Sequence, residues 1–465
     1  MMQKMKLSST ALLGGLLVAG SLMTTTAAMA NTINSEIQAN GSIVISKNGQ
    51  VVTLIDAATT SSLGLETATL NLLLGVLEQQ KVPLNEWPQK LSEIVTYYQA
   101  LVVATDSIQA ADETLQPLKV AVKQAVRDVD LEQAGILFNE IRNQSMNAEP
   151  PLQLTAAEAD AANGARALTQ LSLEEAGDYY LRASSMMEIM GEKYHEKWSH
   201  YADMAGTAFR DAGFYAEADA LLTTAFSLRE KYVSDSQLMT TSLNKLADIK
   251  RLMGHYDKAL PLYKLVQKQK EATFGAQHAQ VAIAINNVAD IYRLKQDFAQ
   301  ALPLYQRALN INRAVLGNEH PDVATTMNNL AGLYEATGKF EQALALYEEA
   351  LTVNEKIHGE DHPSVATTLN NLAGLYRALG KFETALPLYQ RDLAISRKSL
   401  GENHPDVATT LNNLGILYFH MEDFVQSAEY LEQALRIFRL KLGINHPNTA
   451  SVEESLVVIR EKLSQ

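Results

Sequence analysis

The chain has 465 residues, a formal net charge of −14 at pH 7 and no cysteine. This acidity disfavours non-specific binding to nucleic acid or anionic lipid, because both require positive charge on the protein. The lack of cysteine excludes disulfides and a lipid anchor on cysteine. Beyond the N-terminal segment, no run of 18 apolar residues predicts a membrane span.

Residues 1–30 have the pattern of a secretory signal peptide. Lys4 and Lys6 form a basic start, an apolar stretch follows, and Ala28-Met29-Ala30 matches a cleavage motif. Such segments are removed on export. We therefore expect cleavage after Ala30 and an exported protein, periplasmic or secreted; an uncleaved N-terminal anchor is the alternative.

Residues 31–149 form a mostly helical N-terminal region that begins with a different pattern. Over 42–55, two β-prone runs flank Asn48-Gly49, which is typical of a hairpin turn. Apolar residues at helical spacing then predict helices over 63–79, 88–105, 117–129 and 131–143. The paired prolines Pro150 and Pro151 do not fit a helix interior, so we place a linker there.

The rest of the chain is an internal repeat. Residues 320–361 and 362–403 match at 26 of 42 positions without a gap. The 42-residue step continues in both directions, and it is carried by five histidines, four tyrosines and four phenylalanines: His278, His320, His362, His404 and His446; Tyr292, Tyr334, Tyr376 and Tyr418; Phe298, Phe340, Phe382 and Phe424. A fixed period of this length indicates an array of stacked units.

Within each unit, small residues and aromatics follow the order of a helix–turn–helix, as in Gly338, Phe340, Ala343, Tyr347 and Ala350. This pattern resembles the tetratricopeptide repeat (TPR), and the segments HPDVATTxNNLAxLY and KFExALxLYxxAL resemble the long units of kinesin light chains. The resemblance implies an all-α fold, a superhelical solenoid of antiparallel helix pairs. We expect diverged units over 155–235, regular 42-residue units over 236–445 and a capping helix over 446–465.

The paired asparagines on the first helix of each unit are the main candidates for ligand contact. Adjacent helical positions are about 100° apart, so the two cannot do the same work. The resemblance implies that the first Asn faces the concave groove and contacts the backbone of a bound peptide, while the second (Asn287, Asn329, Asn371 and Asn413) faces the neighbouring unit. The first-position residues are Asn244, Asn286, Asn328, Asn370 and Asn412. The alternative is that both asparagines only stabilise the array.

One turn further along the same helices, the units differ, and specificity is expected where a constant frame varies. The candidate groove residues there are Arg251, Arg293, Glu335, Arg377 and Phe419. The arginines can pair with acidic ligand side chains. Neighbouring acids such as Asp248 and Asp290 offset them, so solvation of these charges is the simpler hypothesis.

The recurring histidines are not predicted to bind metal, because residues 42 apart lie at equivalent corners of different units and do not converge. His-Pro-Asp fits a helix start, with Pro at the first helical position. No catalytic or phosphate-binding motif appears. The sequence therefore predicts a non-enzymatic scaffold without metal or cofactor that binds a peptide or partner protein. A structural subunit of a larger exported assembly or homo-oligomer is the alternative.

Overall fold

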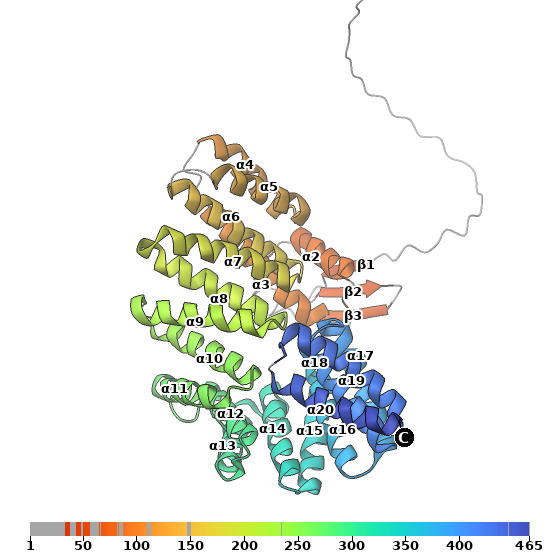
Figure 1. The fold of residues 1–465 in the computed structure, drawn as a ribbon. Coiled ribbons are helices and arrows are strands. Elements are labelled where there is room, and N and C mark those ends of the chain that lie inside the picture. The colour runs from red at the N-terminus through yellow and green to blue at the C-terminus, as the bar shows by residue number, and fades with distance from the viewer. Residues whose placement is uncertain are drawn as a thin grey trace, which may run out of the picture.

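Helices in antiparallel pairs, stacked side by side along a curved path, make up almost all of the structure (Figure 1). It is a computed structural model that describes residues 33–37, 43–47, 50–55, 65, 67–80, 82, 87–108, 113–146, 150–233, 235–444 and 446–464. The predicted signal peptide lies outside these residues. The predicted all-α solenoid is confirmed.

The elements before the regular array are β1 (Ile33–Ile37), β2 (Ile43–Lys47), β3 (Gln50–Ile55), α2 (Thr67–Gln79), α3 (Trp87–Ser107), the 3-10 turn η2 (Glu113–Leu115), α4 (Gln116–Arg127), α5 (Leu131–Ser145), α6 (Pro150–Thr169), α7 (Leu173–Met190), the 3-10 turn η3 (Glu192–Tyr194), α8 (His195–Asp211) and α9 (Tyr215–Tyr232). The array continues with α10 (Ser236–Leu252), α11 (Tyr256–Phe274), α12 (Ala279–Leu294), α13 (Phe298–Leu316), α14 (Pro321–Ala336), α15 (Phe340–His358), α16 (Pro363–Ala378), α17 (Phe382–Leu400), α18 (Pro405–His420), α19 (Phe424–Lys441) and α20 (Pro447–Leu463).

The three strands form an antiparallel sheet in the order β1-β2-β3. β2 and β3 lie over the residues predicted for the hairpin, with Lys47 paired to Gln50. The turn residues between them lie outside the described part of the chain. Strand β1 was not predicted from the sequence.

The N-terminal helices surround α6, which is buried on every side from Leu154 to Leu168. α5 and α7 pack on two of its faces, and α3 covers a further one. Pro150 and Pro151 do not interrupt a helix; they open α6, where a missing N–H costs nothing. The prediction of a linker at Pro150 and Pro151 is therefore wrong, because both residues belong to helix α6.

The regular units pack through small residues between large ones. Ala331, Ala343 and Ala350 are fully buried, and Leu330 and Tyr347 fill the space beside them. First helices of successive units touch, α12 against α14, α14 against α16 and α16 against α18, so the hairpins form one continuous stack. Apolar burial across these contacts supplies most of the stability of the array.

The recurring histidines cap the first helices. In each of the five, imidazole Nδ1 accepts a hydrogen bond from the backbone N–H two residues on: Gln280 to His278 at 3.1 Å, Asp322 to His320 at 3.1 Å, Ser364 to His362 at 3.0 Å, Asp406 to His404 at 3.2 Å and Asn448 to His446 at 3.2 Å. Each bond satisfies an N–H that has no partner inside its helix. The predicted helix start is correct, although the sequence did not reveal the imidazole as the cap.

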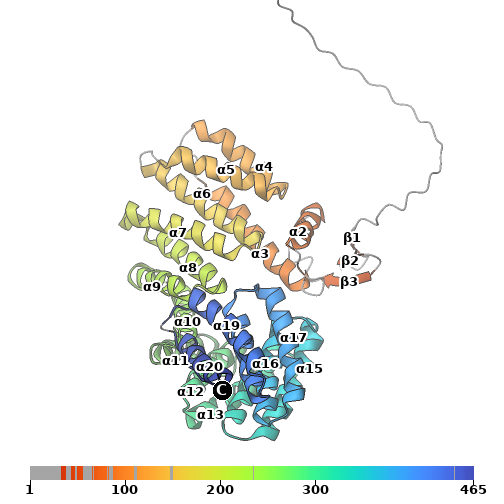
Figure 2. The ribbon, with the colours of Figure 1, turned by 45° about the vertical axis from the view of Figure 1, so that its right-hand side comes forward.

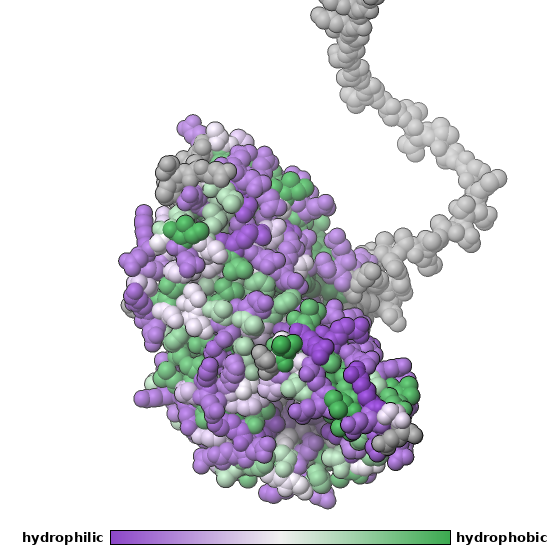
Figure 3. All heavy atoms as spheres, in the orientation of Figure 1, coloured by the Kyte–Doolittle hydropathy of each residue, from purple (hydrophilic) through white to green (hydrophobic). Residues whose placement is uncertain are grey.

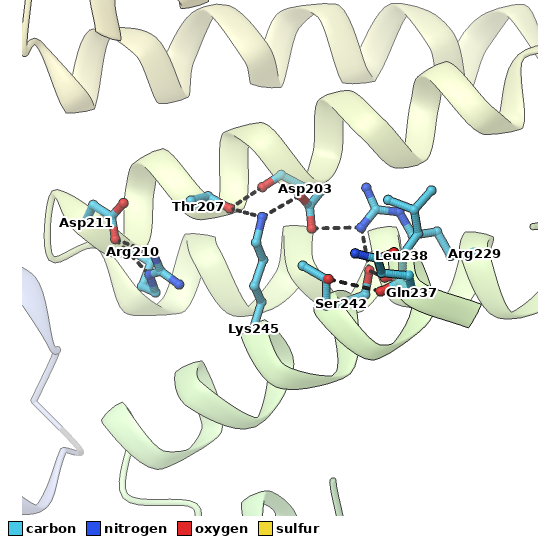
Figure 4. Close-up of polar contacts among 10 residues, drawn as sticks. Asp203, Thr207, Arg210, Asp211, Arg229, Gln237, Leu238, Ser242 and Lys245 are labelled. Carbon is cyan, nitrogen blue, oxygen red and sulfur yellow. Dashed lines mark hydrogen bonds and ion pairs between the residues drawn. The ribbon is translucent and has the colours of Figure 1, made fainter. Parts of the chain in front are cut away.

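A network of buried charges joins the diverged units to the regular array (Figure 4). Asp203 on α8 accepts from Arg229 on α9 at 3.0 Å and from Lys245 on α10 at 2.6 Å. Lys245 also donates to Thr207 at 2.9 Å, and Arg229 donates to Ser242. Asp203 and Arg229 are each only 5% exposed, so three helices are held by one carboxylate.

The stack curves until its C-terminal helices meet α8–α10 (Figures 1 and 2). Lys441 donates to the carbonyl of Ala212 at 3.2 Å, and a ring nitrogen of His446 lies 3.1 Å from the carbonyl oxygen of Leu252, 194 residues away in sequence. The two contacts span 229 and 194 residues of sequence, so each joins units about five repeats apart. The turn glycine Gly213 lies directly against Pro405.

Hydrophilic side chains dominate the face drawn in Figure 3, and the hydrophobic ones are scattered among them. Among the described helices, none is both long and apolar enough to cross a membrane.

Candidate functional site

The five predicted first-position asparagines are not equivalent in the structure. Asn244 donates to Asp248 at 3.0 Å, and Asn370 accepts from Asn413 at 2.9 Å. Asn286 and Asn328 are each 7% exposed, and in both the side-chain oxygen Oδ1 is buried without a hydrogen-bond partner among the described residues. The fifth, Asn412, is half-buried on α18.

The two central asparagines therefore differ physically from their neighbours. A buried amide oxygen without a partner costs about 1–3 kcal/mol, so such groups call for an explanation in a native structure. Asn328 is in register with Asn244, but the residue four positions after it is Gly332 where Asn244 has Asp248. The acceptor that fixes Asn244 is thus missing from the unit of Asn328.

The predicted arginines already have an acid of their own chain. Arg293 lies 2.7 Å from a carboxylate oxygen of Asp290, and Arg251 lies 4.0 Å from the other oxygen. Asp290 thus lies between arginines of two successive units. Because Asp290 offsets part of the positive charge of both Arg251 and Arg293, these two arginines give no strong preference for acidic ligands.

In three successive units, a tyrosine on the second helix donates to an acid on the first helix. Tyr263 donates to Asp248, and Tyr305 donates to Asp290 at 3.3 Å. In the next unit, Tyr347 donates to Glu335 at 3.1 Å. Burial raises the pKa of the Glu335 carboxyl above its usual range, while the Tyr347 hydroxyl and the nearby Arg377 and Arg293 lower it.

Three of the predicted residues meet around one cavity of about 290 Å³. Arg293, Asn328 and Glu335 line it. The same wall includes Gly332, Ala336 and Tyr347, together with both second-position asparagines of this region, Asn329 and Asn371. The cavity thus lies on α14, with side chains from α12, α15 and α16 completing it.

The last two predicted residues, Arg377 and Phe419, do not line this cavity. Arg377 lies beside Tyr389, and its Nε is buried without a hydrogen-bond partner within the described residues. Phe419 packs against Phe424, with ring centroids 5.7 Å apart, and belongs to a hydrophobic cluster of the C-terminal units. The apolar surface of Phe419 is thus used partly by the chain itself.

The sequence profile of the tetratricopeptide repeat family matches residues 238–314, 280–356, 328–398, 364–440 and 406–460. Residues 238–460 of this chain are tetratricopeptide repeats. The cavity and all ten predicted groove residues lie within these tetratricopeptide repeats. No curated protein matches the chain.

Several solved structures are similar to the tetratricopeptide-repeat chain. BtubC (BKLC) from P. vanneervenii is 26% identical over 51% of this chain and 93% of its own, with a TM-score of 0.37. A candidate kinesin light chain of Podosopora anserina with nearly identical TPR-like repeats is 25% identical over 43% of this chain and 95% of its own, with a TM-score of 0.34. A Rap protein complexed with competence and sporulation factor is 14% identical over 79% of this chain and 99% of its own, with a TM-score of 0.46.

Sequence reasoning did not include Gly332, Tyr347, Asn329 and Asn371 in the site. It assigned the second-position asparagines to packing, whereas Asn329 and Asn371 line the cavity, and only Asn413 bonds a neighbouring unit. The available signal was the loss of aspartate at position 332, in register with Asp248 and Asp290. Within the described residues, no group of three or more His, Asp or Glu side chains is placed to hold a metal ion.

Proposed function

We propose that the repeat array binds an extended peptide, either free or as a segment of a partner protein, along helices α10 to α18, and that it acts as a scaffold and not as an enzyme. Tetratricopeptide repeats typically mediate protein–protein interaction, and the family is generally non-enzymatic. The observation that carries the proposal is the pair of central asparagines, Asn286 and Asn328, whose buried amides lack a partner for oxygen.

An asparagine amide suits this work because it offers one acceptor and two donors, which match the C=O and N–H of a peptide unit. Since no hydrogen bond to Oδ1 fixes these two amides, a half-turn of the side chain exchanges oxygen and nitrogen at little cost. Each can therefore meet a donor or an acceptor of the ligand backbone. Such contacts grip a segment without selecting its side chains.

The cellular location of the protein is proposed from the sequence alone. The pattern over 1–30 is that of a secretory signal peptide, so the ligand would be met outside the cytoplasm after cleavage behind Ala30. Fractionation of cells that express the full chain, followed by N-terminal sequencing, tests this proposal. A mature protein that begins at Asn31 supports it, whereas an intact N-terminus in the cytoplasm contradicts it.

A selection with random dodecapeptides displayed on phage, using the full chain as bait, tests the groove. Selected peptides are synthesised, and their dissociation constants are measured by fluorescence anisotropy. We expect the double variant N286A/N328A to bind about tenfold or more weakly, because it loses two hydrogen bonds of about 1 kcal/mol each. Asn310, exposed on the second helix α13, provides the control N310A, which is expected to bind like the wild type.

Circular dichroism and thermal unfolding establish that each variant retains its fold. The proposal is wrong if the selection yields no binding peptide, or if folded N286A/N328A binds as tightly as the wild type. A fixed oligomer that survives dilution in light scattering, together with a failed selection, would favour the structural-subunit alternative.

A further inference from the structure

The cavity on α14 exists because one carboxylate has moved along the helix. In the two preceding units, the acid that accepts the tyrosine hydroxyl is Asp248 or Asp290. In register with them stands Gly332, and the hydroxyl of Tyr347 goes instead to Glu335, three residues on. The space that an aspartate side chain would take is therefore open.

This space is large enough to admit a side chain. At about 290 Å³, the cavity has roughly ten times the 30 Å³ that a water molecule takes in the liquid. A Cβ on Gly332 would lie 3.3 Å from the Tyr347 hydroxyl oxygen and meet nothing else within 4 Å, so nothing but that hydroxyl crowds this position. A peptide crossing α14 has room to place several heavy atoms there.

The charges in the wall balance. Arg293 is paired with Asp290 at 2.7 Å, and Glu335 accepts from Tyr347 under the influence of Arg293 and Arg377. A cationic or an anionic ligand group would meet both signs at once and lose its hydration. The balance favours a neutral group.

The remaining wall is rich in amides. Asn328, Asn329 and Asn371 each present donors and an acceptor, and the Oδ1 of Asn328 is buried without a partner in the described structure. An apolar side chain would leave these groups unsatisfied, which is costly in a buried site. The complementary ligand group is neutral and both donates and accepts hydrogen bonds.

We infer that the Gly332 cavity is a specificity subsite of the peptide groove that receives the carboxamide side chain of a glutamine or asparagine. This inference rests on the proposed function and adds to it a selection that contacts to the peptide backbone do not give. In the bound state, the carboxamide hydrogen-bonds to the Asn328 amide and to the other amides of the wall. The unit thus selects a side chain where the two preceding units carry an aspartate.

The dodecapeptides selected on the full chain supply the probe. We expect them to share Gln or Asn at one position, and replacement of that residue by Ala to weaken binding about tenfold, as expected for one or two neutral hydrogen bonds. Replacement by Leu, Glu or Lys is expected to weaken it at least as much. The set is measured by fluorescence anisotropy on the folded wild type.

The variant G332D restores the aspartate that two other units carry at this position, so it is expected to fold. It places a carboxylate in the cavity and offers Asn328 an acceptor, as Asp248 does for Asn244. We expect G332D to bind the Gln peptide and its Ala counterpart equally, at the affinity of the wild type for the Ala peptide. The control G75D adds the same charge at an open position of α2, with no atom within 4 Å of a new Cβ, and is expected to retain the tenfold discrimination.

The outcomes separate the two proposals. Selected peptides that lack a shared Gln or Asn, or discrimination that survives in folded G332D, would overturn the subsite and leave peptide binding in place. Failure to select any peptide would overturn both. Equal loss in G332D and G75D would also reject the subsite, because charge and not the cavity would then explain the effect.

Discussion

Helices α6 and α14 differ in how their buried polar groups are paired. On α6, Asp160 is fully buried between Arg142 at 2.8 Å and Arg182 at 3.3 Å, and Arg166 reaches Glu175 at 2.5 Å. On α14, by contrast, Asn328 is nearly as buried but its amide oxygen has no partner among the described residues. The buried charges on α6 are thus paired within the chain, whereas the buried amide oxygen on α14 is not.

The difference shows how one hairpin scaffold serves two purposes. A buried ion pair is tolerated only with good geometry and full hydrogen bonding, which fixes the surrounding helices in one arrangement. α3 completes this closure by covering a face of α6. In the regular units, the Oδ1 atoms of Asn286 and Asn328 have no partner among the described residues, and that hydrogen-bonding capacity is available to a ligand.

The largest effect is expected where the two regions join, at Asp203. The variant D203A leaves the buried cation of Arg229 unpaired and removes the acceptor of Lys245. Loss of one partner from a buried pair typically costs 3–5 kcal/mol, and we expect a loss of this size in the free energy of unfolding by urea. Asp178, exposed on α7, gives the control D178A, which is expected to change stability by less than about 0.5 kcal/mol. Equal effects of D203A and D178A would remove the claim that charge pairing fixes this junction.

A second buried aspartate, Asp392 on α17, is expected to behave in the opposite way. It stands in register with Ala308 and Ala350, is 3% exposed, and accepts only hydroxyl groups, from Thr410 at 2.7 Å and Ser396 at 2.9 Å. Burial raises the pKa of its carboxyl to about 7. The folded protein therefore prefers the protonated form, and stability falls as pH rises from about 4 through 7.

The variant D392A is accordingly expected to be more stable than the wild type at pH 8. A shift of about three units corresponds to roughly 4 kcal/mol, and the loss of two hydrogen bonds leaves a gain of about 2 kcal/mol. Near pH 4 the wild-type carboxyl is neutral when folded, and the gain should vanish or reverse. Urea unfolding at both pH values measures the difference in the free energy of unfolding between D392A and the wild type. A gain in stability that does not depend on pH would show that the smaller side-chain volume, and not the loss of an ionisable group, causes the gain.

The sequence predicts the regular units well because their signals are local and repeated. The helix starts at His320 and His362, the buried aromatics such as Tyr347 and the stacking of hairpins all follow from the 42-residue period. The closure of α6 by α3 is not predictable in this way, because it joins segments about 60 residues apart that share no motif. The same holds for the contact of Lys441 with Ala212, which depends on the accumulated curvature of the whole stack.

At the site, the sequence identifies candidate residues but not their partners. It places Asn244, Asn286 and Asn328 in register, yet only the structure shows that Asp248 fixes the first and that nothing described fixes the oxygens of the other two. The cavity arises where Gly332 has no side chain. A spacing pattern in the sequence shows which residues are present, but it does not readily show an empty space between them.

The contact between the two regions can be tested with turn glycines of the same backbone conformation. Gly213 and Gly338 have φ of +83° and +73°, so Ala at either position costs about 1–2 kcal/mol. A Cβ on Gly213 would also lie 2.6 Å from Cδ of Pro405, whereas one on Gly338 meets nothing within 4 Å. We expect G213A to lose about 1 kcal/mol more than G338A and, unlike it, to increase the radius of gyration measured by small-angle X-ray scattering. Identical scattering from the two variants would mean that the contact does not hold the coil closed.

The smallest effect concerns how the two regions begin their helices. In the N-terminal region α5 is capped by Asp130, while α12, α14, α16, α18 and α20 are capped by the neutral imidazole of histidine. Protonation would remove the Nδ1 acceptor of His362, so acid is expected to weaken the cap of α16. Burial, together with His358 and Lys90, lowers the pKa of His362 to about 4. Its contribution is thus complete above the ordinary value of 6.5 and lost as pH falls through 4.

Replacing His362 with asparagine separates the effect of capping from the effect of protonation, because an asparagine side chain accepts the same backbone hydrogen bond at any pH. At pH 7.5 we expect H362A to lose about 1 kcal/mol, the typical contribution of one cap, and H362N to lose little. At pH 4 the order should reverse, with H362N more stable than the wild type, since only the wild type must then exclude a proton from a buried ring. Urea unfolding of the three proteins at the two pH values measures this crossing. If H362N and the wild type keep a constant difference, the cap of α16 does not depend on the charge of its histidine, and the regular units have no more acid sensitivity than the N-terminal helices.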